Sequence, residues 1–398
     1  MKHIVYIPGL GYNFNTDLSM EAYAHRMRLA LENNNDPKLK YEIKVTKSKY
    51  GGNGMYSSDI AVITENDGKA SKNLYKIYEF KYGDELIAKY KKNNKFSQLI
   101  MIAFVVIGRI FNIVTGKKRV IAMGNKQRAQ TIWMVILILS AMLFGVLVLA
   151  SLLTSLSTAL AQVKTGFLKD IDDWMHLHKR LNAIALGITS VTSAMFIFNK
   201  SYKDKFYEST TEFLCANNYL KFNECSDVIL GKLDELLQLI AENENDTDEI
   251  GIHAYSFGSV IALDFLYPYG NAPSNLVRSR IDTLVTIGCP FDFIRTYYPF
   301  FYQGRQNNNL HLNKWINVHS STDILSSNFR NDDRITEPAT TPVVKDGLLP
   351  ENVLYDRINP ASLSFPDYVF MIGLKAHTMY WGTTVDAQSF MNNVVQKL

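Results

Sequence analysis

Residues 250–259 read IGIHAYSFGS, and this stretch decides the fold that the rest of the chain must fit. A short apolar segment (250–254) leads into a turn of small residues, and the apolar residues that follow (260–266) predict a buried helix. The pattern is therefore a strand, a tight turn and a helix, with Ser256 on the turn.

A serine on such a turn is presented at the edge of a sheet, where it can act as a nucleophile. The turn is tight, so the residues two positions before and after Ser256 must be small enough for strand and helix to approach each other. Gly258 meets this requirement, and Ala254 stands where glycine is usual. The alternative interpretation is that Ser256 is only a polar residue in a strand-to-helix turn.

Two downstream segments supply the groups that a serine nucleophile needs. In this arrangement the acid and then the base follow the nucleophile along the chain. Asp323 ends the stretch KWINVHSSTD, and His377 lies in GLKAHTMYW just before the last predicted helix. His377 would take the proton of Ser256 and later return it to the leaving group. Asp323 would hold the imidazole tautomer and stabilise its charged form.

Each partner has an alternative. Asp292, in the stretch TIGCPFD, is a rival acid, and Asp323 could instead cap a turn. His319 is a rival base, although it ends a predicted strand and precedes the acid in the chain. The order of the residues and their place in loops favour Asp323 and His377.

The first strand of the chain also ends in a turn that suits this chemistry. Residues 5–11 read VYIPGLG. Backbone N–H groups on such a turn can stabilise an oxyanion, together with the N–H that follows the nucleophile. We predict an oxyanion hole formed by the backbone of Leu10, with Gly11 beside it, and by the N–H of Phe257. The alternative is an ordinary tight turn.

Taken together, these segments resemble the α/β-hydrolases of the lipase and esterase group. The resemblance covers about residues 1–85 and 220–398, on the pieces VYIPGLG, HAYSFGS, LVTIGCPFD, WINVHSSTD and AHTMYW. It implies hydrolysis of esters, thioesters or amides through an acyl-enzyme, without a metal or organic cofactor. It does not fix the substrate, because one fold hosts many chemistries.

Strands alternate with helices on both sides of a long apolar region, which predicts an α/β fold with a mainly parallel sheet. The α/β-hydrolase domain is then made of residues 1–95 and 200–398, with an insertion at 96–199. Strands are expected at 3–7, 41–45, 75–82, 250–254, 281–287 and 315–318, with a short element beginning at 60–63, and helices at 18–31, 230–240, 260–266 and 385–395.

The insertion is expected to cross a membrane. Residues 129–163 contain no charged side chain, and as a helix they would span roughly 50 Å, more than the bilayer core of about 30 Å. Because the two halves of the sheet must share one compartment, the number of crossings is even, and we predict transmembrane helices at about 132–153 and 181–198. The alternative pairs 96–116 with 132–153 and would place the basic residues at 117–128 on the side opposite the catalytic domain. Residues 96–116 contain Arg109, so we place them along the membrane interface.

The distribution of Lys and Arg then orients the protein. With this pair of helices the basic residues at 117–128 and 200–205 stay with the catalytic domain, which favours a cytoplasmic location for that domain. The alternative for the insertion is a hydrophobic cap over the active site. The two interpretations are compatible, because a membrane-embedded cap could deliver acyl substrates.

Composition excludes several other classes of protein. The net charge is only +4 and there is no basic stripe with interleaved aromatic residues, so nucleic acid is not an expected partner. Three cysteines (Cys215, Cys225 and Cys289) indicate neither a disulfide framework nor a zinc site. The first apolar run is too short for the core of a signal peptide.

The sequence thus predicts a membrane-anchored serine hydrolase that cleaves carboxylic esters, lipid esters among them, with the lipid membrane and an acyl-ester substrate as partners. One alternative is an acyl-protein thioesterase or acyltransferase that uses the same three residues. Another is a non-catalytic membrane scaffold or effector that retains the fold.

Overall fold

The computed structural model describes residues 1–10, 18–91, 101, 105, 211–221, 225–243, 249–270, 273–307, 311–332, 334, 336–364, 367, 375–382, 384 and 386–398. The chain divides into two compact units. The first comprises Met1–Lys89, Asn112–Trp133 and Cys215–Leu398, and the second comprises Tyr90–Phe111 and Met134–Leu214. The sheet and the residues of the candidate site belong to the first unit.

The segments predicted to meet the membrane (96–116, 132–153 and 181–198) lie outside the described residues, apart from Met101 and Val105. Within the described part of the chain, no helix has both the length and the apolar character needed to cross a bilayer. The predicted crossings therefore stay predictions.

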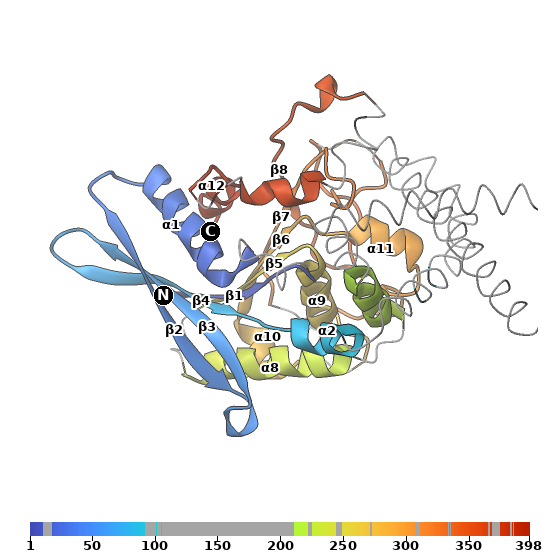
Figure 1. The fold of residues 1–398 in the computed structure, drawn as a ribbon, viewed down its shortest axis with the longest axis horizontal. Helices are drawn as coiled ribbons and strands as arrows, with labels where there is room; N and C mark the ends of the chain where they lie inside the picture. Colours follow the sequence, from blue (N-terminus) through green and yellow to red (C-terminus); the bar gives the residue numbers. More distant parts are fainter. Residues whose placement is uncertain are drawn as a thin grey trace, which may run out of the picture. The chain divides into compact units, whose positions relative to one another are not determined.

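One eight-stranded sheet organises the described residues, in the order β2-β3-β4-β1-β5-β6-β7-β8 (Figure 1). Five of its neighbouring pairs are parallel, and only β3 runs antiparallel to both of its neighbours. The strands are β1 (Lys2–Ile7), β2 (Lys40–Tyr50), β3 (Tyr56–Asn66), β4 (Ser71–Glu79), β5 (Ile250–Tyr255), β6 (Ile281–Ile287), β7 (Lys314–His319) and β8 (Glu351–Leu354).

Helices cover both faces of this sheet. Figure 1 shows α1 and α12 on one face and α8, α9 and α10 on the other. The α-helices are α1 (Met20–Asn34), α2 (Gly83–Lys91), α8 (Ser226–Asn243), α9 (Phe257–Leu266), α10 (Asn275–Arg280), α11 (Phe291–Tyr297) and α12 (Met391–Val395). Short 3-10 helices are η3 (Gly52–Gly54), η4 (Pro360–Ser362) and η6 (Lys375–Trp381). The predicted α/β class, with a mainly parallel sheet flanked by helices, is confirmed.

The strands that contribute to the site run side by side and end at one edge of the sheet. β1, β5, β6 and β7 are consecutive parallel neighbours, and apart from the first residue or two of β1, β6 and β7 their side chains are buried. Apolar side chains on both faces explain this burial. In open α/β sheets the crevice outside the carboxyl ends of such strands is where ligands bind.

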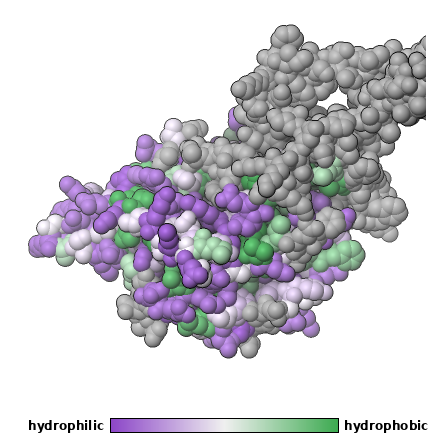
Figure 2. Space-filling view, turned by 60° about the horizontal axis from the view of Figure 1, so that its bottom comes forward, coloured by the Kyte–Doolittle hydropathy of each residue, from purple (hydrophilic) through white to green (hydrophobic). Residues whose placement is uncertain are grey.

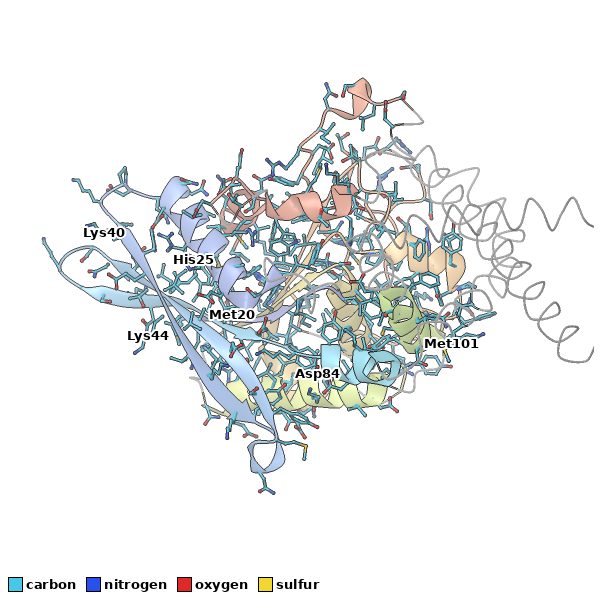
Figure 3. All side chains as sticks on the ribbon, viewed as in Figure 1. Met20, His25, Lys40, Lys44, Asp84 and Met101 are labelled. Carbon is cyan, nitrogen blue, oxygen red and sulfur yellow. The ribbon has the colours of Figure 1, made fainter. Side chains whose placement is uncertain are left out.

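The hairpin of β2 and β3 differs from the sequence prediction, which placed shorter elements at 41–45 and 60–63. Both strands have eleven residues. The second half of β2 lies on the edge of the sheet and carries exposed polar side chains, so it lacks the apolar alternation that marks a half-buried strand. In Figure 3 the side chains of Lys40 and Lys44 extend from this strand away from the sheet.

Other differences involve short elements. The strand β8 and the helices α2, α10 and α11 were not predicted, and the helix expected at 385–395 begins only at Met391. Elements of four to nine residues contain too few apolar positions to establish a period. On the face drawn in Figure 2 the described residues are mainly hydrophilic, with small, separate hydrophobic patches.

A buried histidine lies in the middle of the sheet. His253, on β5, is 1% exposed, and its Nδ1 contacts the hydroxyl of Tyr23 on α1. Burial lowers the pKa of His253 from 6.5 to about 3, and the charge of Lys2 adds to the effect. The folded protein therefore keeps this imidazole neutral at a pH where the unfolded chain would protonate it.

This difference makes stability depend on pH. As the pH falls below about 6.5 the unfolded chain binds a proton at His253 and the folded chain does not, so His253 should lower stability by up to about 1.4 kcal/mol per pH unit. As the pH is lowered from about 6.5 to 5, we expect the thermal midpoint of His253→Gln to fall less than that of the wild type. The control His311→Gln changes an exposed histidine and should keep the wild-type decline. Equal slopes for the wild type and both variants would contradict the prediction.

Candidate active site

The predicted nucleophile lies on a strained turn. β5 ends at Tyr255, α9 begins at Phe257, and Ser256 between them has φ 53° and ψ −121°. A non-glycine residue with positive φ outside the left-handed helical region costs on the order of 1–3 kcal/mol, and such strain is concentrated at functional sites. This backbone conformation directs the residue out of the strand and into the helix, as a nucleophile elbow requires.

Crowding around the turn explains its small residues. A Cβ atom on Gly258 would lie 2.3 Å from the carbonyl oxygen of Ile7 and 2.5 Å from that of Pro8. Only glycine lets α9 approach the end of β1 this closely. Ala254 is fully buried, and its carbonyl accepts a hydrogen bond of 2.9 Å from the Ser259 hydroxyl. A methyl group in place of the usual glycine is therefore accommodated at this position.

The structure brings the three predicted residues into one chain of hydrogen bonds. Nε2 of His377 lies 2.7 Å from Oγ of Ser256, and Nδ1 of His377 lies 2.8 Å from Oδ2 of Asp323. With the proton on Nδ1, the imidazole donates to the carboxylate and accepts from the serine hydroxyl. These three residues are separated by 54 and 121 positions in the sequence, so only the fold places them together.

Asp323 is fully buried, and several donors surround its carboxylate. Its Oδ1 accepts from the N–H of Leu325 at 2.9 Å. Its Oδ2 accepts from the hydroxyl of Tyr380, also at 2.9 Å, as well as from His377. Burial, and then the charge of Asp323, raise the pKa of Tyr380 well above its usual value, so the phenol stays protonated and donates. A buried carboxylate needs such donors to remain charged.

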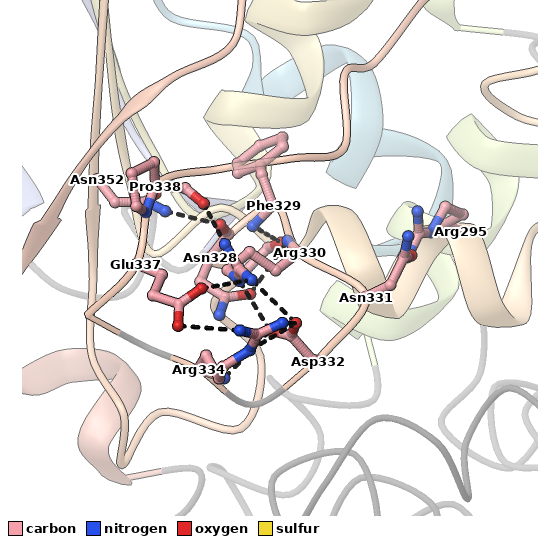
Figure 4. A network of polar contacts seen from close by, with 11 residues as sticks. Arg295, Asn328, Phe329, Arg330, Asn331, Asp332, Arg334, Glu337, Pro338 and Asn352 are labelled. Atoms are coloured by element: carbon pink, nitrogen blue, oxygen red, sulfur yellow. Dashed lines mark hydrogen bonds and ion pairs between the residues drawn. The ribbon is translucent and has the colours of Figure 1, made fainter.

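The loop that carries Asp323 is itself anchored. Asp356, just after β8, accepts from the hydroxyl of Ser320 at 2.7 Å and from the N–H of Ser321 at 2.8 Å. Further along, Arg330 is 4% exposed and forms a bidentate pair with Asp332, at 2.7 and 2.9 Å (Figure 4). Arg330 also pairs with Glu337 at 2.9 Å. A planar guanidinium with two carboxylates fixes the course of the loop beyond the acid.

His377 lies on the 3-10 helix η6, where the sequence predicted a loop. The end of β6 packs directly against this helix. Gly288 has φ 58°, and a Cβ atom there would lie 3.0 Å from the ring of Tyr380 and 3.2 Å from Cε1 of His377. Glycine at this position therefore leaves the space that the imidazole occupies.

The rival acid and base have other roles. Asp292 accepts a hydrogen bond from Ser327 and pairs with Arg295 at 3.2 Å. His319 is fully buried at the end of β7, where it pairs with Leu354 of β8. Neither residue replaces Asp323 or His377 in the hydrogen-bond chain to Ser256.

The predicted oxyanion turn lies beside the serine. A Cβ atom on Gly9 would be 3.0 Å from Cβ of Ser256, so the turn after β1 is in close contact with the nucleophile. Leu10 follows as a buried residue, and Gly11 lies outside the described residues. Phe257 opens α9, and helices leave the N–H groups of their first turn without intrahelical partners. The two predicted donors therefore belong to segments that meet at Ser256.

Two residues of this site were not predicted from the sequence: Tyr380 and Gly288. Tyr380 lies three residues after His377, in the stretch GLKAHTMYW. Its role depends on a contact across 57 positions, and no local pattern signals such a contact.

Among the described residues, no three His, Cys, Asp or Glu side chains are grouped so that they could hold a metal ion.

No protein-family model, curated protein or solved structure matches this chain.

Crowding at Gly258 leads to a prediction with a matched control. Gly258→Ala places a methyl group against two backbone carbonyls, and overpacking of this kind costs about 1–3 kcal/mol. We expect a lower thermal midpoint and a loss of any Ser256-dependent activity. Gly231→Ala is the control, because its Cβ meets open space on α8 and alanine favours a helix by roughly 0.5–1 kcal/mol. A Gly258→Ala variant as stable as Gly231→Ala would contradict the prediction.

Proposed function

We propose that this protein is a serine hydrolase of the α/β-hydrolase type that cleaves carboxylic esters through an acyl-enzyme. The observation that carries the proposal is the hydrogen-bond chain from Ser256 through His377 to Asp323, with distances of 2.7 and 2.8 Å. The strained backbone of Ser256 supports the proposal further, because backbone strain of this kind is concentrated at functional sites.

The chemistry follows from the order of the groups. Oγ of Ser256 attacks the ester carbonyl as its proton passes to Nε2 of His377. The imidazolium that forms is stabilised by Asp323, which also keeps Nδ1 protonated and the ring oriented. The N–H groups of Phe257 and Leu10 would stabilise the oxyanion of the tetrahedral intermediate.

Collapse of this intermediate breaks the bond to the alcohol, which leaves with the proton from His377. A water molecule then attacks the acyl-serine, and His377 again takes and returns one proton. The products are a carboxylic acid and an alcohol, and the enzyme is regenerated. The ester and one water molecule balance the two steps, and His377 returns each proton that it takes.

The proposal includes a membrane. The absence of charge over residues 129–163 supports a crossing at 132–153. A second crossing at 181–198 keeps both parts of the sheet in one compartment, and the distribution of Lys and Arg favours the cytoplasmic side for the catalytic domain. Esters with long acyl chains partition into bilayers, so lipid esters are the substrates that fit such an anchor. A series of p-nitrophenyl esters of increasing chain length would show this preference directly.

The test of the proposal is labelling by a fluorophosphonate probe together with ester hydrolysis by the full chain. We expect Ser256→Ala to abolish labelling and to lower kcat by at least about a thousandfold. Asp323→Asn should lower kcat by about ten-thousandfold, because the amide no longer holds the required imidazole tautomer.

The control for this test is Asp292→Asn, which makes the same chemical change at the rival acid. It should keep labelling by the probe, although the loss of its pair with Arg295 lowers stability. Equal labelling of the wild type and Ser256→Ala would reject the proposal.

A further inference from the structure

The residue immediately before the nucleophile contacts the base in two ways. Tyr255 ends β5 and is 3% exposed. Its ring stacks on the imidazole of His377, with centroids 5.5 Å apart and an interplanar angle of 23°. Its hydroxyl donates a hydrogen bond of 2.7 Å to the backbone carbonyl of His377. One side chain therefore contacts both the ring and the backbone of the residue that accepts the proton of Ser256.

Tyr255 is itself fixed from other sides. The ring of Trp381 meets it edge to face at 5.0 Å and 86°. A Cβ atom on Gly9 would lie 3.1 Å from its Cδ1, so the turn after β1 packs against the same ring. Such close packing leaves the phenol few alternative rotamers.

The far end of the base segment is anchored on α1. Arg26 is 2% exposed, its Nε donates to the carbonyl of Trp381 at 2.8 Å, and its guanidinium lies 5.4 Å from the centre of that indole ring. The helix η6 is thus held by Arg26 at Trp381 and by Tyr255 at His377. A 3-10 helix of seven residues has poor internal hydrogen-bond geometry and depends on such tertiary contacts.

We propose that Tyr255 is a positioning residue that sets the location and the ring plane of His377 relative to Ser256. The inference rests on the proposed function, since it assigns Tyr255 to the same reaction. The hydroxyl fixes the backbone of His377, and the stacked ring limits rotation of the imidazole. The electron-rich face of the phenol also attracts the imidazolium that forms when His377 takes the proton.

Tyr255 is adjacent to the nucleophile in the chain and contacts the base in space. Tyr255 is joined to Ser256 by a peptide bond, so a shift of the backbone at the nucleophile also moves the side chain that contacts the base. Reacting groups need their geometry within about 0.5 Å, and a misplacement of about 1 Å can cost roughly a hundredfold in rate. Tyr255 therefore couples the two ends of the 2.7 Å contact between Oγ and Nε2.

Two substitutions separate the contributions of Tyr255. Tyr255→Phe keeps the stacked ring and removes only the hydrogen bond to the His377 carbonyl, so we expect kcat to fall about tenfold while KM stays within about twofold. Tyr255→Leu removes both contacts, and we expect a loss of about a hundredfold in kcat. The rate of fluorophosphonate labelling should fall in the same order.

The matched control is Tyr41→Phe. Tyr41 lies on the edge strand β2, and its hydroxyl donates a hydrogen bond of 3.0 Å to the carboxylate of Glu65. This substitution should reproduce any general loss of stability without changing kcat. Suppose that the probe labels the wild type at Ser256 but Tyr255→Phe has the same kcat as Tyr41→Phe. The positioning role of Tyr255 is then wrong, and the proposed function stands. If the wild type is labelled no more than Ser256→Ala, the proposed function fails and the inference fails with it.

Discussion

The close approach between the start of α9 and the end of β1 is the constraint on which the rest of the site depends. Gly258 lies against the carbonyls of Ile7 and Pro8, and Ser256 adopts a positive φ so that the chain can turn between β5 and α9. The same contact brings Gly9 against Ser256 and Tyr255. Burial of the strands and the helix around Ser256 thus offsets the cost of its strained backbone. In this conformation the serine hydroxyl is directed at His377.

Parallel strands supply the other groups. β1, β5, β6 and β7 end at one edge of the sheet, so the turn at Gly9, the nucleophile, Gly288 and the loop of Asp323 are brought together although they are distant in sequence. His377 comes from outside the sheet and is located by contacts with Tyr255, Tyr380 and Gly288. The acid is therefore fixed by its loop and its hydrogen bonds, while the base is fixed by its hydrogen bonds with Asp323 and Tyr255 and by packing against aromatic side chains.

The sequence was sufficient to predict the central strands, the strained turn and the three residues of the hydrogen-bond chain. Each of these has a local signature: an apolar run before small residues, or an acid and a histidine in loops in the expected order. Tyr255, Tyr380 and Gly288 have no such signature, since their roles come from contacts across 57 to 122 positions. The long strand β2 was underestimated because edge strands carry polar side chains, and β8 was missed because four residues establish no period.

Covalent attachment at Ser256 is the most direct measure of the central claim, and it can be followed with a p-nitrophenyl carbamate, whose carbamoyl-enzyme hydrolyses slowly. We expect the full chain to release about one p-nitrophenol per molecule before turnover stops, because one nucleophile reacts once. Peptide mapping by mass spectrometry should then locate the carbamoyl group on Ser256. Release without a stoichiometric limit, or a carbamoyl group on another residue, would contradict the mechanism.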